Sequence, residues 1–283
     1  MNRKLIKGDR GIIRHFKSGR LPATFLLLLL FISVLPAAMN VFNKDQKPMD
    51  LEAWWIITEK NVGAHTPAVE NRISVTMMAN LVKYYDTRTL RMFIFNLDTD
   101  RFWLVKIQSR TIAEGTFDEL RNLFEQKRNK REAELKSMDN MRPNAPGATL
   151  ELRNKFVGNE KELMELAAAK FKGRASQESS PDISGHKLSA TDVISNRKKV
   201  GTVWTASDIA ASNRWKRFIS LMVDLEPERW RIIEAAENVP LRAKLNFGNL
   251  EITWELVSIN TNRPAISNFI LPTDHMLVKP TLE

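Results

Sequence analysis

The 283-residue sequence contains no cysteine, and this absence removes several kinds of chemistry at once. Disulfides, zinc–thiolate sites, iron–sulfur clusters and a cysteine nucleophile all require that side chain, as does the lipid-modified cysteine of a bacterial lipoprotein. The sequence also lacks a Gly-x-Gly-x-x-Gly turn, a P-loop and a Gly-x-Ser-x-Gly elbow. Because no nucleophile–base pair can be named, we expect a protein that is not an enzyme and that binds no cofactor. An envelope hydrolase is the weakest alternative.

Histidine is scarce as well, and the histidines present do not have the spacing of metal ligands. They are His15, His65, His186 and His275. The pair Asp98 and Asp100 could hold a metal or perform acid–base chemistry, but it lies between two predicted strands, where short Asp side chains favour a turn. Asp224, Glu226 and Glu228 surround Pro227, and we expect them only to stabilise the N-terminus of a helix. We therefore expect no metal site.

Positive charge is concentrated at one end of the chain. Residues 1–21 contain seven Lys and Arg against Asp9 alone, a net charge of +6, so residues 22–283 carry +4 of the total +10. A balance of +4 is ordinary for a domain of that size, and we expect no nucleic-acid partner.

Residues 22–42 form the only long uncharged segment, with a continuous apolar run at 25–32. A basic flank, an apolar run and then small residues are typical of a secretory signal, and the charge asymmetry leaves residues 1–21 in the cytoplasm. Cleavage after Ala38 would place Pro36 at the upstream position that prefers a small residue, and cleavage after Ala37 would place Leu35 there, so neither site fits the pattern well. The segment also approaches the roughly 20 apolar residues that span a bilayer. A cleaved signal peptide and an uncleaved anchor in the inner membrane therefore both remain open.

After a polar linker at 43–50, we expect residues 51–283 to form a single β-rich domain. Short segments rich in β-branched and aromatic residues predict strands, at 51–58, 73–78, 81–85, 90–97, 102–107, 149–157, 186–195, 199–205, 241–247, 249–259 and 267–271. Helices are predicted at 116–138, with a capping box from Thr116 to Glu119, and at 159–172, 206–225 and 227–238. Residues 173–185 are predicted to be a loop.

Hairpin-length connections imply antiparallel pairing, and about ten strands in one twisted sheet must curl, split or close. The predicted fold class is therefore α+β, with a strongly curved antiparallel sheet that forms an incomplete, half-open barrel and helices that cover its mouth.

The order of the segments resembles LolA/LolB-like periplasmic proteins, specifically an uncharacterised branch of that group. The resemblance rests on five short motifs in consistent order, at 93–105, 110–116, 185–190, 200–206 and 266–272. Ile112 replaces a tyrosine of the family pattern, His186 replaces an aromatic residue and Asp100 replaces a turn glycine. The resemblance implies an apolar cavity under helices, and relatives that carry lipid-modified proteins across the periplasm. No lipid-holding position is transferred by it.

Aromatic side chains supply the candidate binding residues. The sequence has seven tryptophans but only two tyrosines, and the adjacent Trp54 and Trp55 must point to opposite faces of a strand. The helix predicted at 206–225 has an apolar stripe that either packs on the sheet or forms a lid over an acyl chain. The candidate lipid-binding residues are Trp55, Trp103, Trp204, Trp215, Phe218, Ile219 and Met222.

Two functions follow from these patterns. The first is a non-catalytic binder or carrier of a lipid, an acyl chain or a lipidated protein in the periplasm of a Gram-negative bacterium. The second is a periplasmic interaction, scaffold or sensor protein tethered to the inner membrane through residues 22–42, with a charged helix at 116–138 that presents a polar face to a protein partner.

Overall fold

The computed structural model describes residues 50–62, 67–140, 160–178, 182–209, 212–236 and 238–282. All of the described residues belong to one compact unit, residues 47–283. The predicted basic region, signal or anchor and most of the linker therefore lie outside them, as does the strand predicted at 149–157. Within the described residues, no helix is both long and apolar enough to cross a membrane.

The described residues form one sheet of twelve strands in the order β12-β6-β5-β4-β3-β2-β1-β11-β10-β9-β8-β7. The strands are β1 (Leu51–Asn61), β2 (Val69–Met78), β3 (Leu81–Asp86), β4 (Arg91–Asn96), β5 (Arg101–Lys106), β6 (Thr111–Thr116), β7 (Lys172–Ala175), β8 (Leu188–Ser195), β9 (Lys198–Ala206), β10 (Pro240–Phe247), β11 (Leu250–Asn260) and β12 (Met276–Val278). All neighbours pair antiparallel except β12, which runs parallel to β6. The predicted fold class, with a curved and unclosed sheet, is confirmed, although the sheet has twelve strands rather than about ten.

Two antiparallel meanders build the sheet outward from its centre. The chain enters at β1 and proceeds to β6 in one direction, while β11 back to β7 extends in the other, and the β1–β11 pairing joins the halves. The turns after β3, β4 and β5 each end in a residue with positive φ, namely Leu90, Asp100 and Arg110. Asp tolerates this left-handed conformation better than most residues, so Asp100 can occupy the position where the resembled family has glycine. The predicted turn at Asp98–Asp100 is confirmed.

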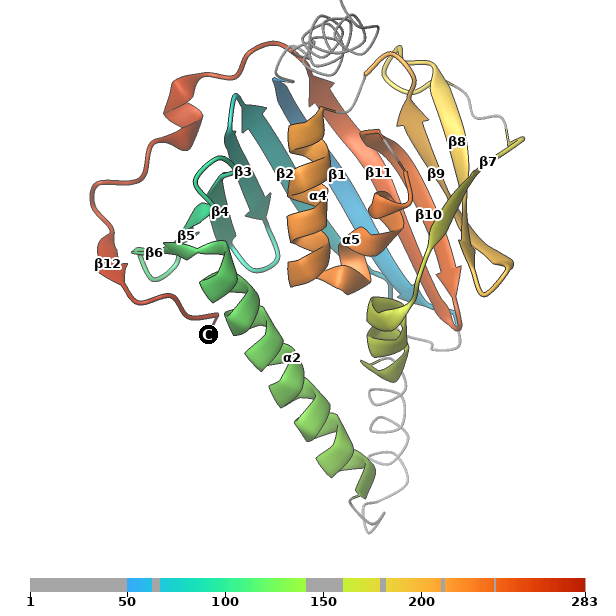
Figure 1. Cartoon of the computed structure of the whole chain (residues 1–283), viewed down its shortest axis with the longest axis horizontal. Helices are drawn as coiled ribbons and strands as arrows, with labels where there is room; N and C mark the ends of the chain where they lie inside the picture. The colour runs from blue at the N-terminus through green and yellow to red at the C-terminus, as the bar shows by residue number, and fades with distance from the viewer. Residues whose placement is uncertain are drawn as a thin grey trace, which may run out of the picture. The chain divides into compact units, whose positions relative to one another are not determined.

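Helices lie on the inner face of the sheet. They are α2 (Phe117–Asn140), α4 (Asn213–Leu225) and α5 (Pro227–Glu234), with a further helix at residues 160–168. Figure 1 shows α4 and α5 in front of the central strands, while α2 runs from the end of β6 away from the sheet, beyond the ends of the strands. Buried and partly exposed residues alternate strictly along β1, where every second residue from Leu51 to Ile57 is fully buried on the inner face. This period-two pattern turns one set of side chains toward the helices.

Local chemistry explains where the helices begin. The predicted capping box at α2 is confirmed, because the Thr116 N–H donates to Glu119 Oε2 at 2.7 Å and the Glu119 N–H donates to Thr116 Oγ1 at 3.3 Å. Pro227 lies in the first turn of α5, as expected. The start of the helix predicted at 206–225 was wrong. This helix, α4, begins after Ser212 and not near Ser207, and the Ser212 hydroxyl accepts the Trp215 N–H at 3.2 Å.

Two more predictions were wrong near the edges of the sheet. Residues 172–175, assigned partly to a helix and partly to a loop, form β7, whose four residues are all exposed and therefore show no alternation of apolar residues. Residues 267–271, predicted as the last strand, mostly form a 3-10 helix, η1 (Ile266–Phe269), and the true edge strand is β12. Phe269 in η1 packs against Met78 and Ile94 on the outer face of the sheet.

Candidate functional site

Five of the seven candidate residues lie together on the inner face. Trp55 comes from β1, and Trp215, Phe218, Ile219 and Met222 form the buried stripe of α4, none of them more than 4% exposed. The Trp55 indole N–H donates to the carbonyl of Pro240 at 2.8 Å. The stripe therefore packs on the sheet, while the adjacent Trp54 is on the outer face beside Tyr85, with ring centroids 6.5 Å apart.

The other two candidates, Trp103 and Trp204, lie on the outer face and do not join this group. Trp103 is half-buried beside the small cluster that contains Phe269. Trp204 lies opposite Arg242 in the sheet, and within the described part of the chain its buried indole N–H has no hydrogen-bond partner. Alternation along a strand assigns its residues to two faces but does not say which face the helices cover. The sequence therefore could not separate Trp103 and Trp204 from Trp55.

The structure adds aromatic residues that the sequence analysis did not select. Trp230 in α5 and Trp254 in β11 are fully buried, with ring centroids 5.1 Å apart. Trp230 also contacts Phe218 at 5.5 Å and Tyr84 at 5.7 Å. The aromatic series continues along the inner face through Phe95, Phe117, Phe93 and Phe124. Side chains thus fill the space between the helices and the sheet.

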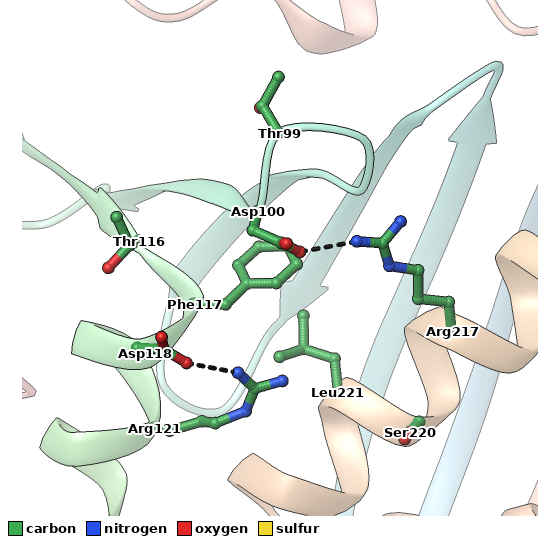
Figure 2. A pocket seen from close by; sticks show the side chains of 9 residues that line it. All are labelled: Thr99, Asp100, Thr116, Phe117, Asp118, Arg121, Arg217, Ser220 and Leu221. Carbon is green, nitrogen blue, oxygen red and sulfur yellow. Dashed lines mark hydrogen bonds and ion pairs between the residues drawn. The ribbon is translucent and has the colours of Figure 1, made fainter.

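Three cavities lined by described residues border α4. The first has a volume of about 440 Å³ and separates α4 from the β4–β5 turn and the start of α2, with Phe117 and Leu221 among the residues that line it (Figure 2). The second, of about 260 Å³, lies beside Trp215 and Ile219. The third, of about 420 Å³, lies at the end of α4 and is lined by apolar residues of three helices, namely Leu163, Met164, Ala167, Ala168, Val223 and Pro227, together with charged residues.

Exposed ion pairs cross the first cavity and connect α4 to its surroundings. Arg217 Nη2 in α4 lies 2.8 Å from Asp100 Oδ1 in the β4–β5 turn (Figure 2). Arg121 in α2 lies 2.9 Å from Asp224 at the end of α4 and 2.8 Å from Asp118. Because each of these side chains is at least 42% exposed, each pair contributes little to stability.

A buried charged cluster lies where α5 begins. Arg229 Nη1 is 3.0 Å from Asp86 Oδ2 and 3.1 Å from Glu226 Oε2, and Arg229 Nη2 is 3.9 Å from Glu59 Oε1. Burial raises the pKa of Glu226, and burial together with the charge of Glu226 raises the pKa of the Tyr84 hydroxyl well above its usual value. The expectation that Glu226 serves only a helix N-terminus was therefore wrong, because it forms an ion pair across this cluster.

The described part of the chain contains no group of three or more His, Asp or Glu side chains that could hold a metal ion. His186 and His275 each contact one carboxylate, Asp208 at 2.8 Å and Asp274 at 3.0 Å. These contacts lower the pKa of both aspartates, chiefly through the hydrogen bond from the imidazole.

Together, the fold and the site define an α+β protein with one open, curved antiparallel sheet whose inner face is covered by helices. No family model matches the chain, and no curated protein matches it in sequence. Among solved structures, it is similar to an uncharacterized conserved protein from Thermus thermophilus, with a TM-score of 0.39 and 7% identity over 86% of this chain and 99% of that chain.

Two further solved structures are similar at the same low level. The first is MucB, with a TM-score of 0.35 and 11% identity over 85% of this chain and 63% of that chain. The second is the LolA superfamily protein NE2245 from Nitrosomonas europaea, with a TM-score of 0.31 and 5% identity over 80% of this chain and 91% of that chain. At such scores the likeness carries no argument about family, ligand or activity.

Proposed function

We propose that this chain is a non-catalytic protein of the Gram-negative envelope that binds an acyl chain, a lipid or a lipidated protein in the periplasm, beneath α4. The observation that carries the proposal is that α4 covers an aromatic inner face and is itself bordered by three cavities. The motifs that resemble LolA/LolB-like proteins support the same function. Residues 22–42 would deliver the domain to the periplasm, as a cleaved signal or as an anchor.

Binding would require α4 to move away from the sheet, because side chains now fill the space beneath it. An acyl chain of about 14 CH₂ groups contributes roughly 11 kcal/mol when it is fully buried. This contribution offsets the packing energy that the buried stripe of α4, which includes Trp215 and Phe218, gives up when the helix moves. The aromatic residues of the sheet would stay covered in both states, by α4 or by the ligand.

The direct test is native mass spectrometry on residues 43–283, which include every described strand and the whole described core. We expect a stable extra mass that matches a lipid, or uptake of an added fatty acid or phospholipid. A folded domain that takes up neither would refute the proposal.

A pair of matched variants tests the role of α4. Arg217→Ala removes the contact between α4 and the β4–β5 turn, and we expect faster uptake of the lipid together with faster amide exchange in α4. Arg242→Ala is the control: its pair with Glu255 at 3.1 Å has nearly the same exposure, 44% and 59% against 47% and 60%, but lies on the outer face. Equal uptake by both variants would show that α4 is not the element that opens.

A tethered interaction or sensor protein is the second candidate, and α2 is the feature that favours it. Its C-terminal half extends past the sheet (Figure 1) and carries charged, mostly exposed residues. Crosslinking in intact cells should then retrieve a protein partner through α2. A cleaved chain without any crosslinked partner would contradict this function.

A further inference from the structure

Two indole N–H groups in the core have no hydrogen-bond partner among the residues that the structure describes. They belong to Trp230 and Trp254, both 0% exposed, whose ring planes meet at 73° with centroids 5.1 Å apart. One donor comes from α5 and the other from β11, so the pair spans the boundary between the covering helices and the sheet. Trp55, a neighbour of Trp254, has its own indole N–H satisfied by Pro240.

Unsatisfied donors of this kind are uncommon, because a buried Trp N–H usually finds an acceptor. The edge-to-face arrangement of the rings provides only a weak contact with a π face. Trp230 also contacts the ring of Tyr84, but the Tyr84 hydroxyl already lies 3.4 Å from Arg229 Nη1. A ligand oxygen that reached both indole N–H groups would satisfy both donors.

We infer that the indole N–H groups of Trp230 and Trp254 bind the carbonyl oxygen of an acyl group, so that the ligand is an acyl compound such as an ester and not a plain alkyl chain. This inference rests on the proposed function and deepens it. It places the carbonyl where the polar and apolar parts of the site meet. On one side, Tyr84 connects Trp230 to the charged cluster of Arg229.

On the other side, Phe218 connects Trp230 to the aromatic interior. The polar end of the ligand would therefore face the charged cluster at the start of α5, and the hydrocarbon tail would follow the inner face toward Phe95 and Phe117. The three cavities around α4 supply the freedom that this helix needs to move.

The test compares two lysophospholipids that differ only at the inferred contact: palmitoyl lysophosphatidylcholine, with an ester carbonyl, and its hexadecyl ether analogue, which lacks that carbonyl. Both are added below micelle formation to ¹⁵N-labelled residues 43–283. We expect the ester to bind at least about tenfold more tightly, because the ether has no carbonyl to accept from either indole N–H. The indole signals of Trp230 and Trp254, two of the chain's seven, should shift downfield with the ester only.

Phenylalanine variants assign those signals and test the contact. Trp230→Phe and Trp254→Phe keep an aromatic ring but remove the N–H, and each should reduce the preference for the ester. Trp204→Phe is the matched control, because its indole N–H is also buried and unpartnered but lies on the outer face, and it should leave the preference unchanged.

The outcomes separate the two proposals. If both lysolipids bind equally and neither core indole signal shifts with the ester, the carbonyl contact is refuted while the lipid-binding function stands. If neither lysolipid binds, and no fatty acid or phospholipid binds in the mass-spectrometric test, the proposed function fails and this inference fails with it.

Discussion

Replacing Arg229 with methionine should destabilise the domain more than the loss of any exposed ion pair. The Arg229 side chain is 13% exposed, and its two nearest carboxylates belong to Asp86, 4% exposed, and Glu226, 22% exposed. Removing the guanidinium leaves buried negative charge without a partner, which typically costs about 3–5 kcal/mol. Glu226 can take up a proton and relieve part of that cost, so we expect a loss of about 3 kcal/mol in the free energy of unfolding.

The assays are urea unfolding and thermal unfolding at neutral pH, both followed by tryptophan fluorescence. For a domain of this size, a loss of about 3 kcal/mol lowers the melting temperature by roughly 6–12 °C. Arg242→Met, which breaks the exposed pair with Glu255, is the control and should cost less than about 1 kcal/mol. Asp86→Asn added to Arg229→Met should restore part of the stability.

A buried carboxylate without a partner would be refuted as the source of the cost if Arg229→Met cost no more than Arg242→Met. It would also be refuted if Asp86→Asn made the Arg229→Met variant less stable, because the unpaired carboxylate would then not be the source of the cost.

Three further predictions concern single residues. Burial raises the pKa of Glu226 above 4.5, so the stability that Glu226 contributes is complete below about pH 4.5 and is lost as the pH rises through the folded pKa. Glu226→Gln should therefore become more stable relative to the wild type as the pH rises. A difference in stability that does not change with pH would contradict this. Thr116→Ala should cost about 1 kcal/mol in chemical unfolding, because the capping box of α2 is lost, whereas Thr116→Ser should cost little. Gly201→Ala should cost about 1–3 kcal/mol and reduce the yield of folded protein, since its Cβ would lie 2.3 Å from the carbonyl of Lys244; unchanged stability would show that the strands separate freely there.

Local patterns were sufficient for most of the strands and for the fold class. Alternation along β1 and the turn chemistry after β4 depend on neighbouring residues, and the structure confirms both. The capping box of α2 is equally local. Elements without such a pattern were missed or misplaced: β7 has four exposed residues, and β12 is a three-residue parallel strand whose partner, β6, lies far earlier in the chain, with Met276 opposite Thr111.

The candidate site shows the same division. The sequence by itself determined that α4 has an apolar stripe from Trp215 to Met222, because helical spacing alone places those residues on one face. Tertiary structure decided that Trp55 lies beneath the covering helices while Trp103 and Trp204 lie outside, since the curvature of the sheet determines which face of each strand is covered. The orphan donors of Trp230 and Trp254 also exist only in three dimensions, because a hydrogen-bond partner can be missing only after the chain has buried the donor.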